Sequence, residues 1–322
     1  MNIYQSIDEF LPVAKPVVTI GTFDGVHLGH QAIFSRMRAE ANEVGGETVV
    51  ITFHPHPRIV LQLESSNLKF INTQEMKIKR LASSGIQNLI IIPFTRDFSR
   101  TSSESFVKDY IVDKIHPYKL VIGYDHHFGK NRMGDFRKLY DMGHRYGFKV
   151  ERIPAQDVEN IAISSTKIRK SLEVGDVHKA NKLLGYEYSI SGEVVHGNEL
   201  GRTIGFPTAN IRVADQYKLI TARGVYACKV ECRGQLYKAM GNIGYRPTIN
   251  ESDLTIEAHL FDFDQDIYDE TITIRFIERI RDEQRFDSLS DLRKQLEADK
   301  LKSLDILSGD IHETDPFVGQ IS

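Results

Sequence analysis

The first half of the chain alternates short apolar runs with longer stretches in which apolar residues recur every three or four positions. Five of the runs are rich in Val and Ile with little polar alternation, which is typical of strands buried on both faces of a parallel sheet. These runs are residues 17–20, 48–53, 88–93, 119–122 and 148–153. The helical stretches between them are residues 30–44, 73–84, 103–116 and 135–146. The pattern predicts an α/β domain with a doubly wound parallel sheet of five strands.

The pattern changes near residue 185. Two short helical stretches, residues 165–173 and 177–184, give way to runs in which polar and apolar residues alternate with period two. These runs are residues 188–196, 224–231, 235–241, 254–262 and 271–276, and Gly, Pro and Asn separate them. We predict a β-rich second domain, a small antiparallel barrel or sandwich, of which we prefer the barrel, with a final helix at residues 288–299. The predicted domains are residues 1–185 and 186–322.

Composition limits the class of protein. A length of 322 residues suggests about two domains, and the net charge of −3, from 41 Lys and Arg against 44 Asp and Glu, argues against a dedicated nucleic-acid binder. We see no apolar stretch long enough to span a bilayer and no secretory signal, so we expect a soluble cytoplasmic protein with no membrane or nucleic-acid partner. Its oligomeric state is left open. We assign no chemistry to Cys228 and Cys232, because a closed zinc site takes four ligands.

A first candidate site follows the predicted strand at residues 17–20. The segment is Gly21-Thr22-Phe23-Asp24-Gly25-Val26-His27-Leu28-Gly29-His30, and a helix comes next. Ligands of open parallel sheets bind beyond the carboxyl ends of the strands, where glycines let the backbone approach phosphate and a helix start offers free N–H groups. His27 and His30 can lie on one side of this helix start and donate hydrogen bonds to phosphate oxygens. Their His-x-Gly-His spacing resembles the signature of the nucleotidyltransferase superfamily, whose members release pyrophosphate from a nucleoside triphosphate.

A second motif stands near the end of the same predicted domain, at residues 163–169. Ser165 and Thr166 supply hydroxyls at a helix start, and Arg169 follows one turn later, which together could hold a polyphosphate. Taken alone, the same residues could be only a helix N-cap. His54-Pro55-His56-Pro57 ends another strand at the same sheet edge. We do not favour metal binding there, because the prolines should keep the segment extended and rigid.

The β-rich half contains Gly201-Arg202-Thr203-Ile204-Gly205-Phe206-Pro207-Thr208-Ala209-Asn210. Glycines that approach phosphate, together with the oxygens of Thr208 and Asn210, suit a Mg²⁺–nucleotide, although an ordinary Gly/Pro loop is the alternative. Further on, Glu257 lies inside an apolar strand, where a carboxylate is either paired or functional. A kinase that phosphorylates a hydroxyl needs such a base beside the nucleophile. A structural salt bridge for Glu257 stays open at this point.

The full set of motifs resembles one family, the prokaryotic bifunctional riboflavin kinase/FAD synthetases, in which the second activity is FMN adenylyltransferase. The matching stretches are residues 21–30, 52–57, 123–134, 163–169, 192–210, 224–226, 241–248, 256–268 and 280–286. The resemblance implies a Rossmann-like nucleotidyltransferase domain that joins FMN to the adenylyl group of ATP, giving FAD and pyrophosphate. It also implies a kinase domain that phosphorylates riboflavin to FMN with Mg²⁺ and ATP. Riboflavin, FMN, FAD and ATP are thus the expected small-molecule partners.

Roles for individual residues follow from the same resemblance. It implies Glu257, His27, His30 and Arg169 as catalytic residues and Thr208 and Asn210 as the metal site. Implied nucleotide-binding residues are Gly21, Phe23, Gly29, Ser165, Thr166, Gly201 and Arg202. Implied flavin-binding residues are Asp125, Arg281, Glu283 and Phe286. Around Asp125 the chain reads Asp-His-His-Phe-Gly, which departs from the more aromatic pattern of the family.

Two alternatives to the bifunctional enzyme remain. The chain could be a single-activity adenylyltransferase that acts on another phosphorylated vitamin, with the second domain as a passenger. It could also be a non-catalytic flavin-binding protein that has kept the pockets. Phosphorylation of riboflavin would exclude the first, and release of pyrophosphate from FMN and ATP would exclude the second.

Overall fold

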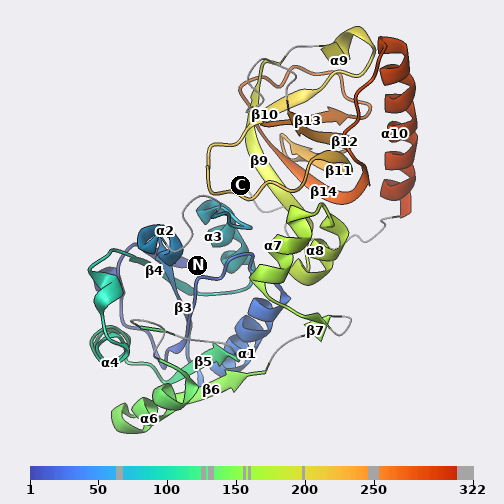
Figure 1. Ribbon diagram of the computed structural model, residues 1–322. Helices are drawn as coiled ribbons and strands as arrows, with labels where there is room; N and C mark the ends of the chain where they lie inside the picture. The colour runs from blue at the N-terminus through green and yellow to red at the C-terminus, as the bar shows by residue number, and fades with distance from the viewer. Residues whose placement is uncertain are drawn as a thin grey trace. The chain divides into compact units, whose positions relative to one another are not determined.

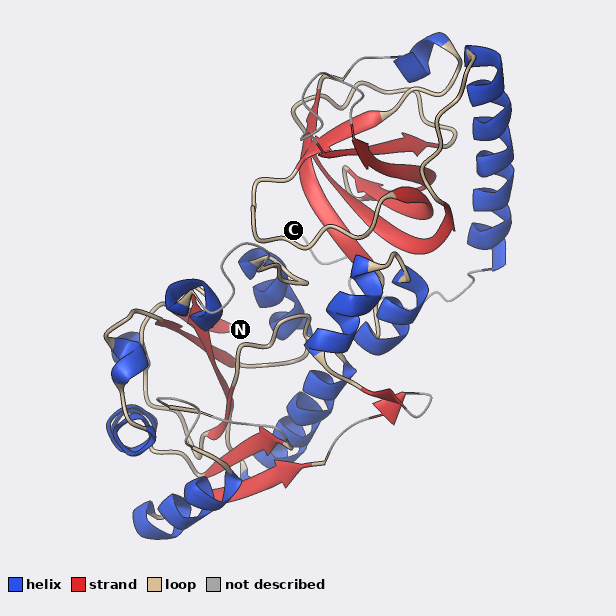
Figure 2. Ribbon diagram, viewed as in Figure 1, coloured by secondary structure: helices blue, strands red, loops and turns tan. Residues whose placement is uncertain are grey.

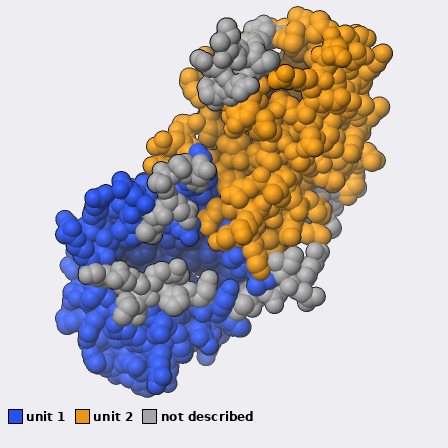
Figure 3. Space-filling model, viewed as in Figure 1, with its two compact units in different colours: residues 1–165 blue, residues 166–322 orange. Residues whose placement is uncertain are grey.

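The computed structural model describes residues 1–62, 68–124, 128–129, 134–154, 157–158, 161–197, 200–245 and 254–309. The chain forms two compact units, Met1–Ser165 and Thr166–Ser322, which Figure 3 shows in different colours. Each unit has its own sheet and its own core, and each is described by itself.

The first unit contains a six-stranded parallel sheet in the order β1-β4-β3-β2-β5-β6 (Figure 1). The strands are β1 (Asn2–Tyr4), β2 (Val17–Ile20), β3 (Thr48–His54), β4 (Asn88–Pro93), β5 (Lys119–Gly123) and β6 (Lys149–Ile153). The predicted parallel sheet is confirmed, but it has six strands and the prediction gave five. The prediction missed β1, which has only three residues, none of them buried, and which exists because Asn2 to Tyr4 pair with Asn88 to Ile90 of β4.

Helices cover both faces of this sheet. They are η1 (Ile7–Glu9), α1 (Leu28–Val44), α2 (Pro57–Leu61), α3 (Gln74–Ser83), η2 (Phe98–Arg100), α4 (Ser103–Ser105), η3 (Phe106–Val112), α5 (Asp113–Ile115) and α6 (Phe136–Tyr146). Alternate strand residues face opposite sides. On one face, Val17, Val50 and Val121 pack with residues of α1 and α3. On the other, Val18, Val49 and Leu120 pack with η3, α5 and α6. The doubly wound arrangement is therefore confirmed.

The prediction of an extended, rigid loop at residues 54–57 is wrong in part, because a helix begins at Pro57. His56 is the N-cap of α2, where its Nδ1 accepts a hydrogen bond of 3.1 Å from the N–H of Arg58. Pro57 is the first residue of that helix, a position where its missing N–H costs nothing. A short hairpin of β7 (Asp157–Val158) and β8 (Ile161–Ala162) also lies in this unit.

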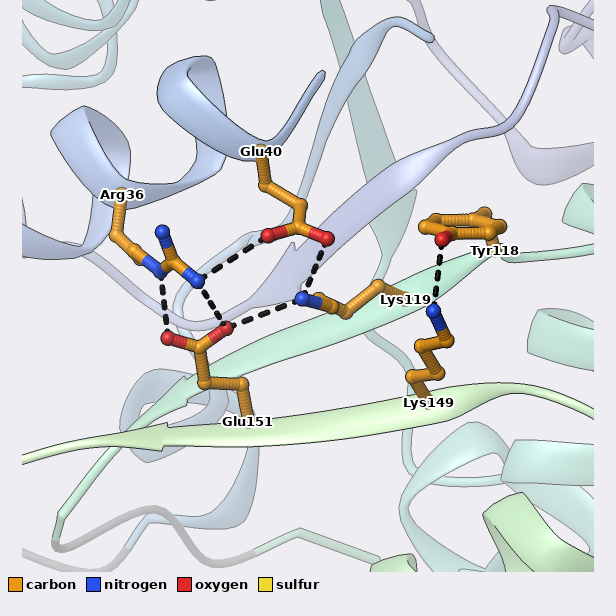
Figure 4. A network of polar contacts seen from close by, with 6 residues as sticks. All are labelled: Arg36, Glu40, Tyr118, Lys119, Lys149 and Glu151. Carbon is orange, nitrogen blue, oxygen red and sulfur yellow. Dashed lines mark hydrogen bonds and ion pairs between the residues drawn. The ribbon is translucent and has the colours of Figure 1, made fainter. Parts of the chain in front are cut away.

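A network of paired charges joins α1 to the sheet (Figure 4). The Nζ of Lys119 on β5 lies 2.5 Å from Oε1 of Glu40 on α1 and 3.2 Å from Oε2 of Glu151 on β6. Arg36, one turn before Glu40, bonds through Nε to Glu151 at 2.5 Å, and this bond is the main cause of the lowered pKa of the Glu151 carboxyl. Each charge in this network has an opposite partner, so the network fixes α1 against β5 and β6.

The second unit is a closed antiparallel barrel, whose strands are drawn in red in Figure 2. The strands follow one another around it in the order β10-β13-β12-β11-β14-β9. The strands are β9 (Tyr188–Val195), β10 (Ala209–Arg212), β11 (Gly224–Cys232), β12 (Gln235–Tyr245), β13 (Leu254–Leu260) and β14 (Thr271–Arg281). The helices are α7 (Ser165–Glu173), α8 (Val177–Leu184), α9 (Leu200–Thr203) and α10 (Leu289–Gly309). The predicted barrel with a final helix is confirmed, although α10 extends ten residues beyond the predicted end at 299.

The prediction missed β10, whose first two residues, Ala209 and Asn210, end the segment interpreted as suited to a Mg²⁺–nucleotide. Its four residues carry no alternation long enough to detect, and they are held by β9 on one side and β13 on the other. This strand matters for function, because it carries Asn210 into register with Glu257.

The compact units divide twenty residues before the predicted boundary at 185, because α7 and α8 pack with the barrel. The side chain of Asn181 on α8 donates to the carbonyl of Phe276 at 2.8 Å and accepts from the N–H of Tyr188 at 2.7 Å. The boundary near 185 concerns the two activities and stays a prediction. Within the barrel, Cys228 and Cys232 are buried free thiols, and burial raises the pKa of both.

Candidate active sites

The turn between β2 and α1 places the first candidate site at the carboxyl edge of the parallel sheet. Phe23 and Val26 both have left-handed backbone conformations, with φ of 49° and 41°. The ring of Phe23 folds back over Gly21, where a Cβ would lie 2.8 Å from its Cζ, so this position requires glycine. Phe23 itself is buried, with 3% exposure, in the core beneath α1. Its side chain therefore supports the turn, and its role in nucleotide binding stays a prediction.

His27 and His30 come together at the start of α1. Their rings stack with centroids 3.6 Å apart and an angle of 15° between the planes. His27 is the N-cap of the helix, and its Nδ1 accepts a hydrogen bond of 3.3 Å from the N–H of His30. The neutral ring therefore carries its proton on Nε2. A Cβ at Gly29 would lie 3.2 Å from the His27 ring, so a glycine keeps room for the stack.

Both histidines are neutral near pH 7. Burial lowers the pKa of His27 to about 4. Burial, together with the charge of His27, places the pKa of His30 well below its ordinary value. The Nδ1 of His30 is buried without a hydrogen-bond partner among the described residues. The pair therefore offers hydrogen bonds to a ligand, and positive charge must come from other residues.

Sequence reasoning gave no role to two charged residues here, Asp24 in the turn and Lys77 beneath it. Lys77 of α3 is only 7% exposed, and its Nζ donates to the carbonyl of Thr22 at 3.4 Å and to the hydroxyl of Thr52 at 3.3 Å. Burial lowers the pKa of Lys77 to about 8, while the nearby Asp24 carboxylate opposes this shift. Asp24 also accepts a 2.9 Å bond from the N–H of Ile71. A lysine one turn before Leu81, on the apolar face of the predicted helix, was the available signal.

Ser165 reaches the same turn from the other end of the unit. Its hydroxyl donates to the backbone carbonyl of Asp24 at 2.8 Å, so the structure brings the two predicted phosphate motifs into contact at this residue. Thr166 and Arg169 belong to the second unit, where Nη2 of Arg169 lies 3.4 Å from the hydroxyl of Thr166. Their approach to the histidines stays a prediction. Asp125 and the two histidines after it lie outside the described residues.

The barrel contains the second candidate site, a cavity of about 1240 Å³. Seven residues predicted from the sequence line it: Gly201, Thr208, Asn210, Glu257, Arg281, Glu283 and Phe286. Arg202 is exposed on α9 and does not line the cavity. The lining also includes residues to which sequence reasoning gave no role, among them Arg223, Asn242 and Tyr245, and the guanidinium of Arg223 lies 5.0 Å above the Tyr245 ring.

Glu257 is central to the polar wall of this cavity. The hydroxyl of Thr208 donates to its Oε2 at 3.3 Å. In the barrel ladder, Asn210 lies opposite Glu257 on one side and Asn242 lies opposite it on the other. A hydroxyl, two amides and a carboxylate thus face one another across three neighbouring strands. Such hard oxygen donors suit Mg²⁺ bound together with phosphate groups.

The end of β14 and the segment after it also line the cavity. Arg281 makes a two-pronged ion pair with the buried Asp299 of α10, with Nη2 to Oδ2 at 2.7 Å and Nε to Oδ1 at 3.0 Å. Its guanidinium also lies 5.8 Å from the ring centroid of Phe286. The carboxylate of Glu283 occupies the space in which a side chain at Gly244 would stand. Arg281 is therefore bound within the protein, and it fixes the wall rather than offering a free charge.

Comparisons with known proteins match each half of the chain to a family model. The family model described as FAD synthetase matches residues 13–167, and the one described as riboflavin kinase matches residues 184–307. The bifunctional riboflavin kinase/FMN adenylyltransferase of Listeria monocytogenes is 39% identical over 91% of this chain and 92% of its own. The enzyme of the same name from Haemophilus influenzae is 40% identical over 88% and 91%.

A solved structure shares the fold over nearly the whole chain. It is a protein from Streptococcus pneumoniae described as a macrolide-efflux protein, with a TM-score of 0.86 and 33% identity over 94% of this chain and 98% of that one. In the described part of this chain, no helix has the length and apolar character needed to cross a membrane. Matches to both family models disfavour the single-activity and non-catalytic alternatives. This chain belongs to the family of bifunctional riboflavin kinase/FMN adenylyltransferases, which make FAD from riboflavin in two ATP-dependent steps.

Proposed function

We propose that the barrel cavity is the riboflavin kinase site and that Glu257 is its base. The observation that supports this most strongly is the convergence of Thr208, Asn210 and Glu257 on one wall of a cavity large enough for a flavin and a nucleotide. Glu257 accepts the proton of the ribityl 5′-hydroxyl while that oxygen bonds to the γ-phosphorus of ATP, and ADP leaves with the bonding electrons. The products are FMN and ADP.

Thr208 and Asn210 are the residues of this chain that would hold Mg²⁺. Among the described residues, no group of three or more His, Cys, Asp or Glu side chains could hold a metal ion. A hydroxyl and an amide beside a phosphate-sized space fit an ion that takes most of its ligands from the nucleotide and water. When bound, Mg²⁺ neutralises phosphate charge.

The adenylyltransferase site lies at the turn before α1. The FMN phosphate is the nucleophile there and is already ionised near pH 7, so no strong base is needed. His27 and His30 align the triphosphate through hydrogen bonds, and the free N–H groups at the start of α1 add a positive dipole end. Because both histidines are neutral, Arg169 is the residue that we expect to supply positive charge, with Ser165 and Thr166 beside it.

Together, the two sites would make this chain a flavin-nucleotide synthase that works in the cytoplasm, where ATP is available for both reactions. Incubation of the purified chain with riboflavin, ATP and Mg²⁺, followed by chromatography, tests it directly. FMN that appears first and FAD that follows would support both sites. FMN without FAD would leave only the kinase proposal, and FAD from supplied FMN without phosphorylation of riboflavin would leave only the adenylyltransferase proposal.

A further inference from the structure

A buried histidine is among the residues that line the kinase cavity. His259 on β13 is 7% exposed and comes two residues after Glu257, so both side chains point to the same face of the strand. Its Nδ1 lies 2.7 Å from the backbone carbonyl of Pro207. A carbonyl can only accept, so Nδ1 is the donor and carries the ring proton.

Aromatic packing holds this ring in place. Phe206 contacts it edge to face with centroids 5.2 Å apart, and Phe261 does the same at 5.6 Å. Both phenylalanines are themselves buried. The ring of His259 thus has a fixed orientation, and its N–H points at a single acceptor.

That acceptor belongs to the segment that carries the proposed metal ligands. Pro207 directly precedes Thr208, whose hydroxyl bonds to Glu257 at 3.3 Å. The regular pairing of this segment with β13 begins only at Ala209, opposite Ala258. The bond from His259 therefore secures the chain just before the ladder starts, where no backbone pairing of β10 with β13 does so.

We propose that His259 is a positioning residue for the phosphorylation of riboflavin. Its Nδ1–H holds the carbonyl of Pro207, and this places the hydroxyl of Thr208 against Glu257 and the phosphate space. The inference rests on the proposed roles of Thr208 and Glu257. It assigns His259 no contact with substrate and no proton transfer.

Two substitutions separate the hydrogen bond from the volume of the ring. In His259→Asn, the amide nitrogen can occupy the place of Nδ1, whereas in His259→Gln the nitrogen reaches the place of Nε2. Both are purified as the full chain, and kcat and KM are measured for riboflavin phosphorylation. FMN adenylylation by the same samples reports whether the rest of the chain is intact.

We expect His259→Gln to lower kcat by roughly 10- to 100-fold, the loss that a misplacement of about 1 Å produces, with KM for riboflavin changed less than about twofold. His259→Asn should stay within about threefold of the wild type. Equal kcat values for the two variants would overturn the inference, because the ring would then only fill space.

A double-mutant cycle with Thr208→Ala completes the test. If His259 acts through Thr208, His259→Gln should cost less than about threefold in the Thr208→Ala background, since the residue that it positions is gone. A full additional loss would contradict the inference. If Thr208→Ala and Glu257→Gln alone leave phosphorylation at the wild-type rate, the proposed kinase site is wrong. If Thr208→Ala and Glu257→Gln abolish phosphorylation while His259→Gln keeps the wild-type rate, the kinase site stands and the proposed role of His259 is wrong.

Discussion

The hydroxyl of Ser165 lies 2.8 Å from the backbone carbonyl of Asp24, although 141 residues separate the two in the chain. This bond joins the last residue of the first unit to the turn that carries the stacked histidines. It shows that the second motif reaches the first at Ser165, although the two motifs lie at opposite ends of the domain in the sequence.

Replacement of Ser165 by Ala should therefore affect one activity only. Loss of this partly buried bond should cost about 1 kcal/mol of stability in the first unit and lower FAD formation from FMN roughly tenfold. Ser165→Thr, which keeps a hydroxyl, is the matched control. Riboflavin phosphorylation, measured in the same samples, should be unchanged, and an equal loss of both activities would count against a local role.

The two functions of His27 can be separated, because it is both an N-cap and a proposed phosphate donor. Asn is a good N-cap, so His27→Asn should keep stability within about 0.5 kcal/mol of the wild type, whereas His27→Ala should lose about 1 kcal/mol. Both should reduce adenylylation by roughly 10²-fold, since neither has the imidazole donor. Thermal unfolding and pyrophosphate release provide the measurements. Wild-type activity in His27→Asn would show that only the cap matters.

Glu257→Gln should lower the rate of riboflavin phosphorylation by about 10²- to 10⁴-fold, because the amide cannot take the hydroxyl proton. FAD formation from supplied FMN should continue at the wild-type rate. Glu278, an exposed carboxylate on β14, provides a control: Glu278→Gln should leave both activities intact. A Glu257→Gln variant that still phosphorylates riboflavin normally would remove this residue from the base role.

The pair of Arg281 and Asp299 should be important for the stability of the second unit. Asp299 is only 2% exposed, so Arg281→Met leaves a buried carboxylate without its cation and should cost about 3 kcal/mol. Arg281→Met combined with Asp299→Leu should recover most of that loss, since both charges are then gone. Hydrogen exchange in α10 measures the effect. Equal protection in the single and double variants would contradict this account of the pair.

Lys77 should make the stability of the first unit depend on pH. Its pKa is about 8 in the folded chain against 10.5 for the free side chain, so between these values the unfolded chain binds more protons at this site. The free energy of unfolding should therefore rise with pH across this window, by up to about 3 kcal/mol, while the full cost of burying the charge applies below pH 8.

Lys77→Met removes this contribution. The stability of the variant relative to the wild type should fall as the pH rises from 8 to 10.5, as measured by urea unfolding at several pH values. A constant difference in stability over that range would show that Lys77 binds its proton equally well in the folded and the unfolded chain.

Local patterns determined much of this protein. Five strands of the parallel sheet and five of the barrel follow from runs of apolar or alternating residues, because burial on two faces or on one leaves a distinct period in the sequence. The same holds for candidate residues of one contiguous motif, such as His27 with His30. A turn or a helix start brings neighbours together without help from the rest of the chain.

Tertiary structure alone decided the rest. The short strands β1 and β10 form because neighbouring strands supply their hydrogen bonds, and nothing in three or four residues predicts this. Lys77 beneath Thr22, Asp299 against Arg281 and His259 on Pro207 are contacts between distant segments. In the sequence alone, these residues are ordinary charged residues and one histidine. Their roles arise from burial and from a partner that only the folded chain provides.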